Sequence, residues 1–307
     1  MNQRFSLLGM ALAAVAAILW GTAGTAQSFI AGGLNSYWVA ALRLVFAVCF
    51  FWPLLFLTGK SAAEPGASHS PIPYPALVVL AGFCMAGFNL CFFNAVKIAG
   101  IALGSCTIIG SAPIWAGLIE TVFYKKRPSP AWLIGIGIAI AGGVWMAVSQ
   151  ARDITVNPWG LLLCLITGLF YASYSILAKE LVKLTTPVRA TAHSFTVAVI
   201  IAAPAAWLIT GTPTLQLHDL LVVAYLGVIV TGVAYLLYGT ALKTTSVSTC
   251  VALGLLEPVT AFVLAIVVVR EAVNNWAVLG LVAILFGLFL VLRSERQSRV
   301  SENQEIV

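Results

Sequence analysis

Long runs of apolar residues, separated by short stretches that are polar or contain glycine or proline, fill almost the whole chain. Each run has close to the roughly 20 residues that an α-helix needs to cross a bilayer. Some connections are very short, and Ala99-Gly100 alone separates the third run from the fourth. The pattern predicts ten membrane-spanning helices: Ser6–Ile30, Tyr37–Leu57, Pro75–Ile98, Ile101–Tyr124, Ala131–Ser149, Trp159–Ala178, Val188–Ile209, Leu217–Leu242, Val247–Val269 and Asn275–Leu292.

Composition supports an all-α integral membrane protein. Hydrophobic residues make up 61% of the chain and charged residues only 8%, whereas soluble domains carry about 25% charged residues. The longest polar connection inside the chain, Gly59–Tyr74, is too short to fold as a domain. The six cysteines lie in apolar runs without CxxC spacing, so we expect them to pack as small apolar side chains and expect neither a metal nor another cofactor.

The distribution of Lys and Arg predicts the orientation, because positive charge collects on the cytoplasmic side. With ten spans both termini share one side, and placing them in the cytoplasm of a bacterial inner membrane leaves only Lys97, Arg152 and Arg270 outside. Arg43 lies within the second span. The net charge of +6 therefore indicates membrane topology and no nucleic-acid partner. The cytoplasmic set is Arg4, Lys60, Lys125, Lys126, Arg127, Lys179, Lys183, Arg189, Lys243, Arg293, Arg296 and Arg299.

The two halves of the chain resemble each other weakly at several positions. "AVKIAG" from Ala95 returns as "ALKTTS" from Ala241, and the recurrence of the first apolar run favours a permanent helix over a cleaved signal peptide. Five helices per repeat is an odd number, so the second repeat crosses the membrane in the opposite sense. We expect an inverted pair of repeats at 1–150 and 151–294, followed by a cytoplasmic tail at 295–307. The aligned pairs are Gly9 with Gly160, Trp20 with Tyr171, Pro113 with Pro258, Gly135 with Gly280, and Gly142 with Gly287.

Three motifs resemble the EamA-type ten-helix exporters of the drug/metabolite transporter superfamily. They are Leu19-Trp20-Gly21-Thr22, the A-x-K entry to the fourth and ninth spans, and "LLEPVTAFVLAIVVVREAVNNWAVLG" from Leu255 to Gly280. Within that family the chain looks most like bacterial amino-acid exporters. The resemblance implies two five-helix repeats around a central cavity, export by alternating access, and no enzymatic activity.

Aromatic and amide side chains within the spans are candidates for lining that cavity. Trp20, Gly24 and Gln27 share one face of a continuous first helix, and tyrosines one turn apart occur in the sixth and eighth spans. Interfacial aromatic belts are the alternative reading of such residues. The candidates for substrate contact are Trp20, Gln27, Asn89, Trp115, Tyr171, Tyr174, Tyr235, Tyr238 and Glu257.

Glu257 and Pro258 interrupt an otherwise apolar helix. The carboxyl could be protonated and structural, bind a substrate ammonium, or carry a coupled proton, and Arg43 could pair with it, bind a carboxylate, or reach the interface. We expect Arg43 and Glu257 to pair. Glu120 is expected to form an interfacial ion pair with Lys125 and Lys126. Pro113 and Pro258 each remove a helix hydrogen bond, and we expect them to be conformational hinges rather than packed kinks.

Small, uncharged or zwitterionic metabolites, amino acids first, suit an aromatic site with few charges. A phosphorylated substrate would require several Lys or Arg in the site, and only Arg43 lies well inside a span. The sequence has no P-loop motif for ATP-driven transport. A lipid-modifying membrane enzyme would need a catalytic constellation, and a channel would need rings of charge from a symmetric oligomer. A monomeric carrier with a small-molecule substrate is the reading that the residues favour.

Overall fold

The computed structural model describes residues 2–30, 34–58, 72–99, 101–125, 128–150, 157–269 and 275–304, and these residues form helices joined by short turns. Ten helical stretches within them are long and apolar enough to span a membrane, which confirms the predicted number. The helices are α1 (Asn2–Gly21), α2 (Ala23–Gln27), α3 (Ser36–Thr58), α4 (Tyr74–Ala99), α5 (Ile101–Tyr124), α6 (Pro130–Gln150), α7 (Pro158–Leu184), α8 (Pro187–Thr210), α9 (Leu217–Tyr225), η1 (Leu226–Val233), α10 (Ala234–Leu242), α11 (Val247–Leu253), α12 (Leu256–Leu264), η2 (Ala265–Val269) and α13 (Asn275–Gln304).

Polar capping residues and prolines set several helix starts. Asn157 accepts hydrogen bonds from the first amides of α7, and Thr186 caps α8 in the same way, each immediately before a proline. At its other end α7 extends to Leu184, six residues past the predicted Ala178, because the polar segment that leaves the apolar run stays helical. Hydropathy therefore located the span but not the end of the helix.

Three of the ten spans are irregular, and of these only the ninth was expected to be interrupted, by a hinge at Pro258. The first changes from α1 to α2 at Thr22, whose amide bonds to the Leu19 carbonyl three residues back at 3.1 Å. The ninth breaks between α11 and α12 at Gly254-Leu255. The eighth contains the π-helical segment η1, where Thr231 Oγ1 donates to the Leu226 carbonyl at 2.8 Å. These irregular segments lie next to the candidate site.

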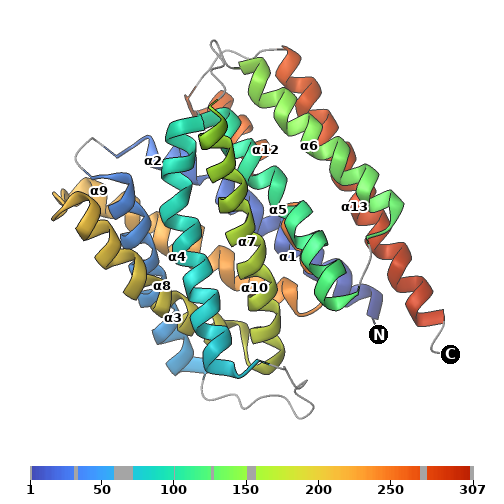
Figure 1. Ribbon diagram of the computed structural model, residues 1–307, viewed down its shortest axis with the longest axis horizontal. Coiled ribbons are helices and arrows are strands. Elements are labelled where there is room, and N and C mark those ends of the chain that lie inside the picture. The colour runs from blue at the N-terminus through green and yellow to red at the C-terminus, as the bar shows by residue number, and fades with distance from the viewer. Residues whose placement is uncertain are drawn as a thin grey trace.

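The helix contacts occur in pairs that the repeat relates to each other. The first span of each half packs on the third and fourth spans of the opposite half. Thus α1 packs on α10 and α12, and α7 packs on α4 and α5. Equivalent helices also pack on each other, α3 on α8, α5 on α11 and α6 on α13. The α6–α13 pair is antiparallel and forms one side of the bundle (Figure 1). This arrangement is the inverted repeat that the odd helix number predicted.

Glycines aligned between the halves make equivalent contacts. A Cβ on Gly9 would collide with Thr244 and Thr245, and a Cβ on Gly160 would collide with Ala99, which aligns with Thr245. Gly9 thus lets α1 pass close to the "ALKTTS" turn of the second half, and Gly160 lets α7 pass close to the "AVKIAG" turn of the first half. The aligned pair confirms a structural equivalence between the start of α1 and the start of α7.

Gly135 and Gly142 of α6 pack against Gly287 and Gly280 of α13. A Cβ on Gly135 would lie 2.8 Å from the Gly287 carbonyl oxygen, and one on Gly142 would lie 2.7 Å from that of Gly280. Because these four residues have no side chains, the two backbones approach directly, as small residues permit in membrane helices. Because Gly135 aligns with Gly280 and Gly142 with Gly287, the repeat relates the Gly135–Gly287 contact to the Gly142–Gly280 contact.

Both chain termini lie at one end of the bundle (Figure 1), which we call the termini end. The end of α7 with Lys179 and Lys183, and the turn after α10 with Lys243, lie at this same end. The predicted loop charges Lys60, Lys126, Arg127, Arg152 and Arg270 lie outside the described residues. The predicted tail begins as a helix, because α13 extends to Gln304.

Candidate functional site

Five of the predicted aromatic residues form one cluster, which we call the aromatic cluster: Trp20, Tyr171, Tyr174, Tyr235 and Tyr238. The Trp20 ring lies 5.1 Å from Tyr235, 5.2 Å from Tyr238 and 6.0 Å from Tyr171, between ring centroids. Tyr174 lies 5.7 Å from Tyr235. These are the separations at which aromatic pairs attract. The cluster joins the end of α1 to α7 and α10.

Helical spacing explains why these side chains meet. Tyr171 and Tyr174 are three residues apart on α7, and Tyr235 and Tyr238 have the same spacing on α10, so each pair projects from one face. All five residues are buried. Phe88 of α4 and Phe195 of α8 extend the cluster, at 5.5 Å from Tyr171 and 5.0 Å from Tyr235. Neither phenylalanine could be predicted as part of the site, because phenylalanine is common at purely structural positions.

The polar atoms of the cluster are unequally satisfied. The Tyr238 hydroxyl donates to Ser175 Oγ at 2.9 Å, and both groups are buried. Trp20 Nε1 is buried and has no hydrogen-bond partner among the described residues. The Tyr171 hydroxyl points toward the break in the ninth span, where a Cβ on Gly254 would lie 3.9 Å from it. The surface of the cluster is therefore mostly apolar, but the Trp20 indole N–H remains free to donate to a further polar group.

Three other candidates are placed outside the aromatic cluster. Gln27 ends the short helix α2, beyond the bend at Thr22, so it does not share a continuous face with Trp20. Asn89 is buried, but its Nδ2 donates to the Met85 carbonyl of its own helix at 2.8 Å. Trp115 donates to the Leu165 carbonyl at 3.1 Å, between α5 and α7. Among the described contacts, no hydrogen bond or ring contact joins these three residues to the aromatic cluster.

Glu257 lies in the first turn of α12, and α12 packs on α1 beside Trp20. A Cβ on Gly21 would lie 2.6 Å from the Glu257 carbonyl oxygen. Arg43, Tyr235 and Glu257 interact electrostatically. The expected direct pair is wrong for this structure, because Arg43 and Glu257 make no ion pair within 4.0 Å. Both charges are next to the aromatic cluster without neutralising each other directly.

The two aligned prolines have different helical settings. Pro113 lies inside the continuous helix α5, whereas Pro258 is in the first turn of α12, just after the break. The Gly254 carbonyl, which Pro258 cannot bond, accepts from the Glu257 amide at 2.9 Å instead. The proline in the second half is therefore accommodated by a broken helix, and the one in the first half by a continuous helix.

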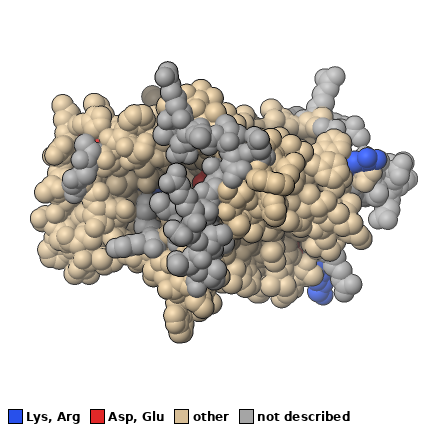
Figure 2. Space-filling model, turned by 90° about the horizontal axis from the view of Figure 1, so that it is seen from above, with Lys and Arg blue, Asp and Glu red and all other residues tan. Residues whose placement is uncertain are grey.

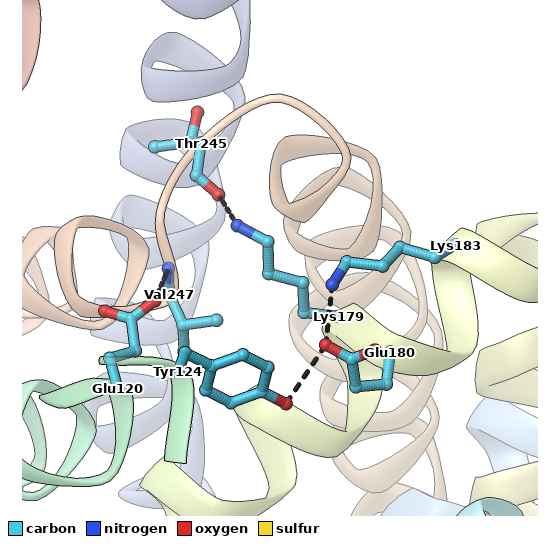
Figure 3. A network of polar contacts seen from close by, with 7 residues as sticks. All are labelled: Glu120, Tyr124, Lys179, Glu180, Lys183, Thr245 and Val247. Atoms are coloured by element: carbon cyan, nitrogen blue, oxygen red, sulfur yellow. Dashed lines mark hydrogen bonds and ion pairs between the residues drawn. The ribbon is translucent and has the colours of Figure 1, made fainter. Parts of the chain in front are cut away.

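A polar network lies at the termini end (Figure 3), and it corrects the expectation for Glu120. The Glu120 carboxylate is buried and accepts from the amides of Val247 and Ser248, each at 3.2 Å, at the start of α11. A carboxylate at a helix N-terminus is stabilised by the free amides there. Glu120 thus binds α11 across the two halves instead of forming the predicted ion pair with Lys125.

Further contacts hold the same turn from the second half. Lys179 Nζ donates to the Thr245 carbonyl at 2.7 Å (Figure 3), and Glu295 accepts from Ser246 Oγ and Thr249 Oγ1, each at 2.8 Å. A pocket of about 70 Å³ lies beside this turn. Its lining residues are Glu120, Tyr124, Ile176, Lys179, Glu180, Lys183 and Val247. None of these contacts was predicted, because the partners lie far apart in the sequence.

Comparisons with known proteins agree with this fold. A protein of known crystal structure superposes on 97% of this chain and 99% of its own, with a TM-score of 0.79 at 19% identity, so the two share a fold. The Bacillus subtilis (strain 168) protein called uncharacterized transporter YwfM is 32% identical over 94% of this chain and 95% of its own length. An uncharacterized transporter of Archaeoglobus fulgidus is 23% identical over 91% of this chain and 97% of its own.

The model of the EamA-like transporter family matches the chain twice, at residues 7–148 and 158–293. The two matches cover the helices before and after the middle of the chain, as an internal repeat requires. Together with ten spans and relatives that are named as transporters, they make the protein a multi-pass membrane transporter and not an enzyme. The chain belongs to the EamA-like transporter family.

Proposed function

We propose that the protein exports small zwitterionic or uncharged metabolites, amino acids first and apolar or aromatic ones among them, by alternating access. The observation that carries this proposal is the aromatic cluster around Trp20, with one positive and one negative residue beside it. Aromatic rings bind apolar side chains through large contact areas, and a site with balanced charge suits a molecule without net charge.

The direction and the location of export rest on charge and resemblance. The excess of Lys and Arg at the termini end supports a cytoplasmic position for both termini in a bacterial inner membrane. The resemblance to EamA-type exporters supports outward movement of the substrate. The internal twofold symmetry places both halves of a carrier in one chain, which supports a protein that functions as a monomer.

The polar contacts support an alternating-access cycle with a defined starting state. At the termini end Glu120 joins α5 of the first half to α11 of the second, and we propose that this contact closes that side. Figure 2 shows the opposite end, where an acidic side chain is visible on the face. In this scheme Pro113 and Pro258 act as hinges, and the cycle requires the Glu120 contact to break when the termini end opens.

Counterflow in proteoliposomes tests the proposal. Vesicles loaded with one unlabelled amino acid are placed in buffer with a labelled amino acid from a panel, and saturable, selective accumulation is the expected result. A Trp20→Ala variant with an unchanged elution profile should accumulate less label. Flux that rises linearly with concentration would indicate a channel. No flux of any amino acid by folded protein would overturn the amino-acid proposal.

Other small metabolites or drugs are the alternative substrates, since the same rings would bind an apolar amine or a neutral drug. The same vesicles distinguish this case, because competition by lipophilic compounds without competition by amino acids would favour it. Selective export from cells that express the protein, measured as lower intracellular content of the substrate, would test the direction.

A further inference from the structure

Besides the Tyr171 hydroxyl, three polar groups in or next to the aromatic cluster have no hydrogen-bond partner among the described residues. They are the Trp20 indole N–H, the Arg43 guanidinium and the Glu257 carboxylate; Trp20 and Arg43 each contain a buried nitrogen without an acceptor. Trp20 is only 8% exposed. All three residues belong to membrane-spanning stretches, where an unpaired polar group is costly.

Four other indole groups among the described residues are satisfied. Trp38, Trp52, Trp115 and Trp145 each donate to an oxygen acceptor at 2.9 to 3.1 Å. Trp132 also lacks a partner, but it belongs to a separate apolar cluster around α6 and α13. A buried donor next to two unpaired charges therefore distinguishes Trp20, and such unsatisfied groups indicate a ligand.

The three groups come from different helices, and each lies near Tyr235. The Tyr235 ring lies 5.1 Å from Trp20, and Tyr235 interacts electrostatically with both Arg43 and Glu257. Gly227 brings η1 against Arg43, since a Cβ there would lie 2.7 Å from the Arg43 carbonyl oxygen. Gly21 brings Trp20 of α1 beside Glu257 of α12. The fold thus positions a cation, an anion and a neutral donor at the edge of the same ring cluster.

The separation of the charges matches a molecule that carries both signs. A direct Arg43–Glu257 pair would satisfy the two residues without any ligand, but they are not within 4.0 Å of each other. A lone cation or anion as ligand would leave the opposite charge of the protein unpaired, which is unfavourable in a low dielectric. An α-amino acid offers a carboxylate to one residue and an ammonium to the other.

We propose that Arg43 and Trp20 Nε1 bind the carboxylate of an α-amino acid zwitterion, that Glu257 binds its ammonium, and that the tyrosine rings contact its side chain. The proposal rests on the proposed function and specifies the ligand class of that site. Arginine suits the carboxylate because its guanidinium presents parallel donors. Glutamate suits the ammonium because a carboxylate offers acceptors only. The site then selects for the two main-chain charges and tolerates several apolar side chains.

Competition with analogues that lack one charge tests this assignment. Phenylalanine, phenethylamine and 3-phenylpropionate share one ring and differ in the charged groups, and each competes against labelled phenylalanine in counterflow. The wild-type protein should prefer phenylalanine over both analogues. Loss of one charge-assisted hydrogen bond corresponds to a roughly 10- to 100-fold weaker half-saturation.

The variants Arg43→Gln and Glu257→Gln should fail in opposite ways. Arg43→Gln should lose affinity for phenylalanine and phenylpropionate while retaining binding of phenethylamine. Glu257→Gln should lose affinity for phenylalanine and phenethylamine while retaining phenylpropionate. The control is Lys183→Gln, which removes an exposed charge at the C-terminal end of α7. It should keep the wild-type order of affinity for the three ligands. Thermal unfolding in detergent shows whether each variant is folded.

The outcomes separate this inference from the proposed function. If the wild-type protein transports amino acids but both variants weaken all three ligands equally, or neither changes their order, the assignment of the two charges is wrong and the exporter proposal stands. If folded wild-type protein binds and moves none of the amino acids, the proposed function itself fails. If one folded variant shows the predicted analogue preference and the other does not, the two-charge assignment is also wrong.

Discussion

Glu120, in the first half of the chain, accepts a hydrogen bond at 3.2 Å from the amide of Val247, in the second half. The contact ties α5 to the start of α11 at the termini end. We expect Glu120→Gln to lose one of its two amide bonds and to shift the population toward a state open at this end. A charge-assisted hydrogen bond contributes about 1.5–3 kcal/mol. Spin labels at Phe123 and Lys243, both exposed, should then show a longer distance component.

Glu295→Gln is the matched control for that change. Glu295 contacts the same turn, through Ser246 and Thr249, but these groups all belong to the second half. We expect the label distance to keep its wild-type distribution in this variant. Equal lengthening in both variants would mean that the turn simply loosens, and the role of Glu120 as a closing contact would be wrong.

Replacing Trp20 by leucine should weaken binding of aromatic amino acids. The indole contacts three tyrosine rings, and ring pairs contribute about 0.5–1.5 kcal/mol beyond their buried area. We expect the half-saturation concentration for phenylalanine to rise roughly 2- to 10-fold in counterflow. Trp115→Leu is the control, because Trp115 lies outside the aromatic cluster, and it should leave this concentration unchanged. An equal effect of both changes would argue against the cluster as the binding site.

The two prolines should separate stability from transport rate. Pro113→Ala restores a hydrogen bond inside the continuous helix α5, so the free energy of unfolding should rise by about 1–3 kcal/mol. Pro258→Ala should add little stability, because the Gly254 carbonyl already accepts from Glu257. If both residues are hinges, both variants should slow counterflow several-fold. Unchanged rates in both would identify packed kinks.

Adjacent glycines on α6 provide a sharp test of the α6–α13 contact. A Cβ on Gly142 would lie 2.7 Å from the Gly280 carbonyl oxygen, whereas a Cβ on Gly143 would meet nothing within 4 Å. We expect Gly142→Ala to lower the free energy of unfolding by about 1–3 kcal/mol through overpacking. Gly143→Ala should raise it by up to about 1 kcal/mol through helix propensity. Thermal unfolding in detergent measures both, and equal shifts would contradict the close approach.

The ten spans and the repeat could be predicted because they depend on local composition and on alignment within the chain. The aromatic cluster could be predicted for a related reason. Tyrosines three residues apart must share a helix face, and the alignment of Trp20 with Tyr171 indicated equivalent positions near one axis. These are properties of a single helix or of the repeat, so no knowledge of the neighbouring helix was needed.

The contacts of Glu120, Asn89 and Trp115 could not be predicted, because each depends on the rotation of a helix against its neighbours. Glu120 has lysines nearby in sequence, yet its carboxylate faces amides 127 and 128 residues away. Asn89 satisfies its amide on its own helix, which no hydropathy pattern reveals. The exact position of the break at Gly254-Leu255 could not be predicted either, because the sequence placed the hinge at Pro258, three residues further on.

The glycine contact between α6 and α13 limits how the sequence can change. In most packed interfaces a larger residue on one side can be accommodated by a smaller one on the other. Here each of the four positions faces the backbone of a glycine in the opposite half, as with Gly280 at 2.5 Å from the Gly142 carbonyl oxygen. No residue is smaller than glycine, so no second substitution on the facing helix can relieve the first, and relief requires the two backbones to move apart.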